Sequence, residues 1–298
     1  MAAIERIMAA DARNIQTGGT VQTTLTVSEP GLLATSRLVA GTCYGDGVTA
    51  GPPVFTDYEM STTYTGLLWN GAQQLIRGRA AVGAAAVNAP SSAFSARRNG
   101  PYVSLGDFAS QASDTLALTT NLNGAVMAGG VNNVISFASP FIPQNRRQGF
   151  TGAIPSAVAY LASTTVNTGA GAGANLLLTA DSDMIVDLSS LVINVQPQIT
   201  GGGAPANMAS FDASLGALIT QIALPTGENL ILGQPDGGLG IGCPGSAFSG
   251  LRLGNYFALG MLAMQGGSAI TVSYQNVLPS QATFSAGMVC HPRNGEGC

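Results

Sequence analysis

The feature that most constrains this chain is an internal repeat at a constant offset of 154 residues. The stretch "PSSAFSARRNGPYVSLGDFASQ" (90–111) aligns without gaps with "PGSAFSGLRLGNYFALGMLAMQ" (244–265), and 12 of the 22 positions are identical. Roughly two identities are expected by chance in a chain so rich in Ala, Gly and Ser. Weaker matches at similar offsets lie on either side, for example 70–78 with 225–233. The repeat therefore extends beyond a single motif.

Two tandem homologous units, 1–147 and 148–298, follow from this repeat. Each has about 150 residues, which is an ordinary domain size. We place the boundary in "SPFIPQNRRQGFTG" (139–152), because this stretch has two prolines and no hydrophobic periodicity.

Most periodic segments alternate with period two, as half-buried strands do. In "ATFSAGMV" (282–289), every second residue from Ala282 to Met288 is apolar and lies on one face. Similar segments span 21–28, 189–197 and 215–224, and 40 glycines and 15 prolines punctuate the chain at short intervals. We therefore predict an all-β fold of two tandem β-sandwich units, each suited to an eight-stranded jelly roll.

A few short helices are expected beside these strands. A helix-like piece at 4–12 leads into "IQTGG" near the start of the first unit, and 155–162 leads into "VNTGAG" in the second. A third short helix is expected at 64–76.

The chain carries very little charge. Charged residues make up 9% of it, where about 25% is usual for a soluble domain, and all 11 basic residues are arginines. Lys and Glu are depleted from protein interfaces, whereas Arg is tolerated there. One interpretation is a surface covered mostly by copies of the same protein; the other is an extracellular or periplasmic protein with a polar, uncharged coat.

The distribution of charge excludes some partners. The net charge is −4, and the only adjacent basic residues are the pairs at 97–98 and 146–147, so we expect no direct nucleic-acid binding. The first residues do not have the pattern of a signal peptide, and no apolar run approaches the length of a membrane span. These features suit a particle that assembles inside a cell and leaves it later.

Two sandwiches in tandem, few charges and no basic arm resemble the double jelly-roll major capsid proteins of tailless, often membrane-containing viruses and phages. The resemblance is architectural, covers the whole chain and depends on the repeat. It implies a structural shell protein whose three chains form a pseudo-hexameric tile, located in the virion after assembly in the host cytoplasm. The implied partners are further copies of the chain and other virion proteins, with room for an internal membrane that the chain does not span.

An alternative from another class is a secreted or appendage β-sandwich protein for binding or adhesion, such as a lectin. An enzyme is not expected. The only histidine, His291, lies in "CHPRN" (290–294), and "FIPQN" (141–145) takes its place in the first unit. Phe and Ile at the matching positions indicate packing rather than catalysis.

No cofactor or metal site is expected either. The four cysteines, Cys43, Cys243, Cys290 and Cys298, have no zinc-finger spacing. We expect buried or free thiols, with three disulfide connectivities left open in an oxidising medium.

The repeat does single out two pairs of residues. Arg98 and Tyr102 in the first unit occupy the same places as Arg252 and Tyr256 in the second. A guanidinium group pairs bidentately and stacks on aromatic rings. We therefore expect these four to be structural or interface residues that hold a loop or a neighbouring subunit.

Overall fold

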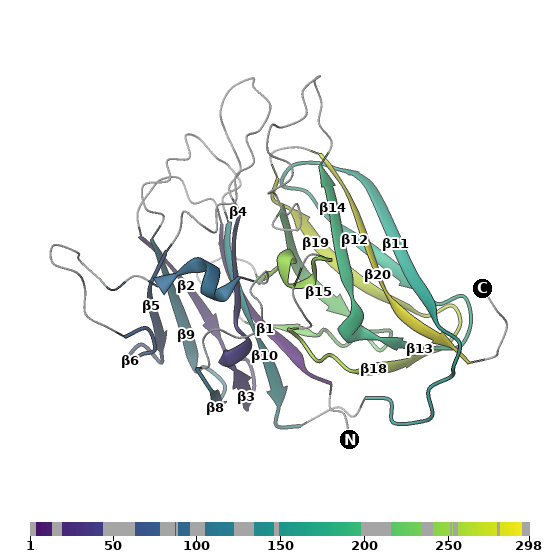
Figure 1. Ribbon diagram of the computed structural model, residues 1–298, viewed down its shortest axis with the longest axis horizontal. Helices are drawn as coiled ribbons and strands as arrows, with labels where there is room; N and C mark the ends of the chain where they lie inside the picture. Colours follow the sequence, from purple (N-terminus) through teal and green to yellow (C-terminus); the bar gives the residue numbers. More distant parts are fainter. Residues whose placement is uncertain are drawn as a thin grey trace.

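The computed structural model describes residues 4–13, 20–43, 63–77, 87, 89–95, 105–121, 134–145, 149–197, 216–233, 241–250, 252, 256–278 and 281–293. In these residues the fold is all-β, as predicted, and two pairs of sheets lie side by side (Figure 1). Within the described part of the chain, no helix is long and apolar enough to cross a membrane.

The first two sheets contain the strands of the first half of the chain and one strand of the second. One sheet has the order β16-β1-β10-β3-β8, with β4 also on β10; the other has the order β2-β9-β5-β6, with β7 also on β5. The bounds are β1 (Arg6–Arg13), β2 (Thr20–Thr26), β3 (Gly31–Ala34), β4 (Val39–Cys43), β5 (Thr63–Trp69), β6 (Gln73–Gln74), β7 (Ala89–Pro90), β8 (Asp107–Ser110), β9 (Thr115–Asn121) and β10 (Val134–Pro143), with 3-10 turns η1 (Thr35–Arg37) and η3 (Ser91–Phe94).

The other two sheets contain only strands of the second half. Their orders are β11-β20-β13-β18, with β14 also on β20, and β12-β19-β15-β17. The bounds are β11 (Ala159–Thr168), β12 (Gly173–Thr179), β13 (Met184–Asp187), β14 (Val192–Pro197), β15 (Ala217–Ala223), β16 (Ile231–Leu232), β17 (Cys243–Pro244), β18 (Met261–Met264), β19 (Ala269–Asn276) and β20 (Ala282–Pro292), with 3-10 turns η4 (Leu188–Ser190) and η7 (Gly245–Phe248).

The two halves share one strand order. Raising each strand number of the first half by ten converts β1-β10-β3-β8 into β11-β20-β13-β18, and β2-β9-β5-β7 into β12-β19-β15-β17. The registers coincide as well. Phe141 pairs with Leu33 on β3, and Cys290, which matches Phe141 in sequence, pairs with Val186 on β13. A register shift even interrupts β5–β9 and β15–β19 at the same place. Only β16 departs: it pairs with β1, whereas the matching residues 76–77 of the first half are in no strand.

The four predicted strands are present as β2, β14, β15 and β20. On β20 the alternate residues Ala282, Phe284, Ala286 and Met288 are all buried, as the period-two pattern predicts. The ring of Phe284 stacks on that of Tyr274, with centroids 3.9 Å apart, so it ties β20 to β19 in the facing sheet.

The expected helices are wrong. The described residues contain no α-helix; 4–12 falls on β1, 155–162 runs into β11, and 64–76 contains most of β5. On β1 the cause is burial on both faces, which removes the polar positions that reveal a strand. Neighbouring residues Ile7 and Met8 are both fully buried.

Two hydrophobic cores meet at β1. Met8 and Ala10 belong to the core of the first sandwich, whereas Ile7 and Ala9 join the core that is built mostly from the second half. Since successive side chains of a strand point to opposite faces, one strand serves both cores. Figure 1 shows β1 in the middle of the molecule, between the two sandwiches.

The unit boundary at 147 and 148 stays a prediction. Strand β10 extends to Pro143, so the first five residues of the expected junction are part of a strand. Residues 146–148 lie outside the described part of the chain.

The close approach of β3 to β10 generates a first prediction. A methyl group on Gly31 would lie 2.5 Å from the carbonyl oxygen of Ile142, against backbone that cannot rotate away. We expect Gly31→Ala to lower the free energy of unfolding by about 2 kcal/mol, measured by urea denaturation. Gly169→Ala is the control, because nothing lies within 4 Å of its added methyl group. Equal stability of the two variants would contradict this packing.

Candidate functional site

The described residues contain no cluster of three or more His, Cys, Asp or Glu side chains that would hold a metal ion. His291 lies on β20, and its Nδ1 is 3.1 Å from the carbonyl oxygen of Ala157. Its imidazole therefore contacts the backbone ahead of β11.

Two of the cysteines are buried thiols outside any disulfide, namely Cys243 and Cys290. Burial raises the pKa of the Cys243 thiol well above its usual value, because a thiolate there would be desolvated. Cys243 lies on β17 in the core shared with β1. The side chain of Cys43 and the whole of Cys298 lie outside the described residues.

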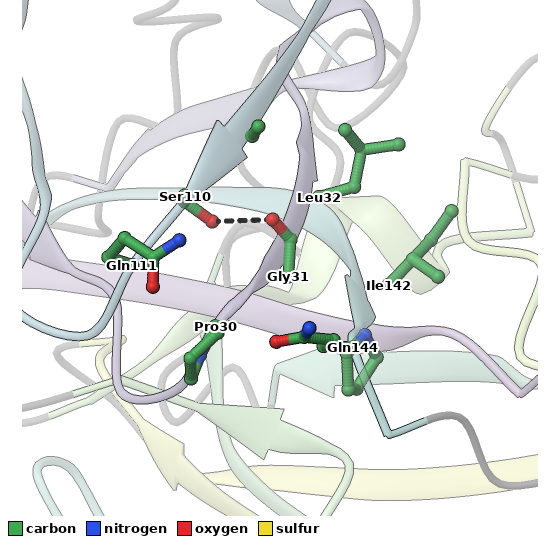
Figure 2. A pocket seen from close by; sticks show the side chains of 9 residues that line it. Pro30, Gly31, Leu32, Ser110, Gln111, Ile142 and Gln144 are labelled. Atoms are coloured by element: carbon green, nitrogen blue, oxygen red, sulfur yellow. Dashed lines mark hydrogen bonds between the residues drawn. The ribbon is translucent and has the colours of Figure 1, made fainter.

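A shallow hollow of about 320 Å³ lies where β3 begins and where β8 and β10 end (Figure 2). Its polar side chains are Ser110, Gln111 and Gln144, and the Ser110 hydroxyl donates to the carbonyl of Gly31 at 3.1 Å. No ionisable side chain lines it, so it has no general acid or base. The lining consists of Pro30, Gly31, Leu32, Ala109, Ser110, Gln111, Ile142, Pro143 and Gln144.

Arg252 binds the η4 turn. Its Nη1 donates to the carbonyl of Leu191 at 2.7 Å, and its Nη2 donates to the carbonyl of Ser189 at 3.3 Å. Burial lowers the pKa of this guanidinium, and nearby Tyr256 and Tyr160 act in the opposite direction. The guanidinium of Arg252 thus binds two backbone carbonyls of this turn. Its expected role toward a neighbouring subunit stays a prediction.

The other predicted residues have different surroundings. The side chain of Tyr256 is buried, and its backbone carbonyl accepts from Nη1 of Arg37 at 3.1 Å. Arg98 and Tyr102 lie outside the described residues.

A charged network that the sequence analysis missed joins the two halves at the start of β1. Glu5 accepts from Arg37 at 2.6 and 3.0 Å, and its Oε2 also accepts from the backbone N–H of Ala258 at 2.8 Å. The Glu5 side chain is only 10% exposed, so these bonds compensate a buried carboxylate. Glu5 and Arg37 therefore connect the first unit to 256–258 of the second.

Arg6 makes a second charged link. It donates to Glu29 at 2.8 Å and to Glu228, from the second half, at 2.5 Å. Beside it the N–H of Ile7 donates to the carbonyl of Leu230 at 2.7 Å, where β16 adds to the edge of β1 in parallel. The adjacent charges Glu5-Arg6 in so uncharged a chain were the available signal for this contact.

The second half has an apolar edge that is open to solvent. Val158, just ahead of β11, is 67% exposed, and Tyr160 on β11 is 59% exposed. Ile154, ahead of β11, is exposed as well, and so is Leu177 on β12 in the other sheet of this sandwich. Single exposed apolar residues are common, but neighbouring ones typically mark an interaction surface.

No protein-family model matches the chain, and no curated protein matches it. Among solved structures, a chain from the atomic structure of Sulfolobus Turreted Icosahedral Virus is 11% identical, with 97% of this chain and 91% of that chain covered and a TM-score of 0.27. A chain from the crystal structure of PBCV-1 VP54, fitted into a reconstruction of the virophage Sputnik, is 10% identical, with 98% and 96% covered and a TM-score of 0.21. TM-scores this low do not establish the fold or the function of this chain.

The Arg252 contacts predict a stability effect. We expect Arg252→Ala to lower the free energy of unfolding by about 2 kcal/mol, because two partly buried hydrogen bonds from a cation to backbone carbonyls are lost. Arg77→Ala is the control: its Nε bonds the carbonyl of Gln74 at an exposed site, so we expect a change within about 0.5 kcal/mol. Normal stability and assembly of Arg98→Ala combined with Arg252→Ala would refute the structural role.

The network at β1 generates a parallel prediction. Glu5→Gln keeps an oxygen for the N–H of Ala258 but removes the charge opposite Arg37, so unfolding should become easier by about 2 kcal/mol. Chemical denaturation measures the difference. Asp181→Asn, in an exposed turn, should change stability by no more than about 0.5 kcal/mol. A similar effect of both variants would mean that the Glu5–Arg37 pair does not stabilise the junction.

Proposed function

We propose that this chain is a structural, self-assembling shell protein: a viral major capsid protein whose three copies form a pseudo-hexameric capsomer. The observation that carries the proposal is the common strand order and register of two sandwiches joined side by side through β1. Three such chains contain six similar units, and a ring of similar units needs only one kind of contact, repeated.

The same observation supports an internal duplication, with homologous units at 1–147 and 148–298. The clearest sequence match covers 22 residues, whereas the matching strand order covers all four sheets. Within the chain, the second unit already packs against β1 of the first unit.

The uncharged composition fits this role. A shell protein is covered by its neighbours, and Lys and Glu are the residues that interfaces avoid. We propose that its partners are copies of itself and other virion proteins, and that it is located in the virion after assembly in the host cytoplasm. No catalytic step and no cofactor are part of the proposal.

A second candidate function is a secreted or appendage β-sandwich protein for binding or adhesion. The hollow in Figure 2 favours it, because the amides of Gln111 and Gln144 offer both donors and acceptors of the kind that bind sugar hydroxyls. A monodisperse monomer that binds glycans would support this candidate and contradict the shell.

The shell proposal predicts assembly that is insensitive to salt. Light scattering and electron microscopy of the purified chain should show trimers or larger particles. Raising the salt from about 0.05 M to about 0.5 M should leave them intact, because few charge pairs are available to be screened. Complete disassembly over this range would count against an uncharged interface, and a strict monomer at every concentration would overturn the function.

A further inference from the structure

We propose that the free edge and outer face of β11 bind the β6–β7 region of a second copy of this chain, residues 73–76 and 89–90. This inference rests on the proposed function and names the surface through which copies associate. Its basis is a contact already present inside the chain, where the second unit covers the edge and outer face of β1.

The contact at β1 has two parts. Along the edge, Ile7 and Met8 pair in parallel with Ile231 and Leu232 of β16. On the outer face, the side chains of Ile7 and Ala9 enter the second unit's core, which also contains Cys243 of β17. The edge and one face of the strand are thus removed from water by the second unit.

The corresponding strand of the second unit has no such cover. Arg6 and Ala159 take the same position, because they pair with the matching residues Phe141 and Cys290. Tyr160 is therefore the counterpart of Ile7. Ile7 is completely buried, whereas Tyr160 is more than half exposed. Within the described residues β11 pairs with β20 alone, and no described strand pairs with its other edge.

The first unit contains the segment that would fill this edge. Asn229 holds the backbone ahead of β16: its Oδ1 accepts from the N–H groups of Ile222 and Ile231. Gln74 does the same in the first unit, where its Oε1 accepts from Leu67 and Ile76.

The backbone bond beside this anchor also recurs. Leu230 donates to the carbonyl of Ile222 at 2.8 Å, and Leu75 donates to that of Leu67 at 2.7 Å. The segment 73–76 is therefore already held in the conformation that pairs with β1 in the other unit. By this correspondence, Ile76 of one copy faces Tyr160 of the next.

The charged pairs at β1 have uncharged counterparts near β11 and in the 73–76 segment. Arg6 and Glu228 pair inside the chain, and their counterparts Ala159 and Gln73 are both uncharged. Glu5 and Arg37 pair as well, and their counterparts Val158 and Ser190 are likewise uncharged. Association through β11 would therefore bury no unpaired charge from either pair. The counterpart of Leu232 is Arg77, which is exposed and lies just beyond the proposed segment.

The two surfaces are at opposite ends of the molecule. In Figure 1, β6 lies at the far left of the long axis and β11 at the right. A contact between different surfaces of identical chains is heterologous, and it gives closed rings where the rotation permits. The occupant of β11 is thus a second copy rather than the same chain.

A charge-restoration experiment tests the pairing. Gln73→Glu alone and Ala159→Arg alone each place an uncompensated charge at the contact, so each should weaken association of the full chain by about tenfold. The double variant recreates the Arg6–Glu228 pair between copies and should return to the affinity of the natural chain or better. Analytical ultracentrifugation over a concentration series gives the dissociation constants.

Gln265→Arg and Gln265→Glu are matched controls, because they make the same charge changes in an exposed turn away from β11. Both should associate as the natural chain does. Gln73 is exposed, so Gln73→Glu remains informative even where Ala159→Arg disturbs folding. Circular dichroism confirms that each variant is folded.

The outcomes separate the two proposals. A natural chain that assembles, with single variants that assemble equally well or a double variant that is not restored, overturns the β11 contact and leaves the shell function standing. A natural chain that stays monomeric at about 100 μM overturns both, since stable specific protein interfaces bind more tightly than that. Weakening by each single change with restoration in the double variant supports the contact.

Discussion

The burial of β1 between two cores is the constraint on which the rest of the structure depends. Its side chains alternate between the core of its own sandwich and that of the other, and β16 completes its edge. Glu5 and Arg6 place charges at the start of this strand, and each is satisfied by partners from both halves. Only one register of β1 both buries its apolar stretch, residues 7–10, and brings Glu5 and Arg6 to their partners.

The same arrangement explains why an uncharged chain suits repeated association. Two sandwiches with one topology present similar surfaces twice, once buried inside the chain and once exposed at β11. At the exposed copy the residues are apolar or small, and the two ion pairs of the buried copy are absent. Exposed sheet edges are ready templates for pairing with another chain, and here the edge also lacks the charged residues that usually protect it.

Sequence reasoning was strongest where one face of a strand meets water. On β2 and β20 the alternation of buried and less buried positions is visible in the residues themselves, and these strands were predicted correctly. It failed at β1, where both faces are buried and the pattern loses its polar positions. The contacts of Arg252 with Ser189 and Leu191 span more than sixty positions, so no local pattern reports them.

By itself, the sequence determined the all-β class, because period-two alternation and frequent glycine and proline leave little room for helices. It also indicated two similar units, since shared Phe, Tyr, Arg and Pro at one offset are hard to obtain by chance. Only the tertiary structure decided how the units meet. The partners of Glu5, Arg6 and β11 depend on which edges are covered in space, and edge coverage is set by long-range packing rather than by neighbouring residues.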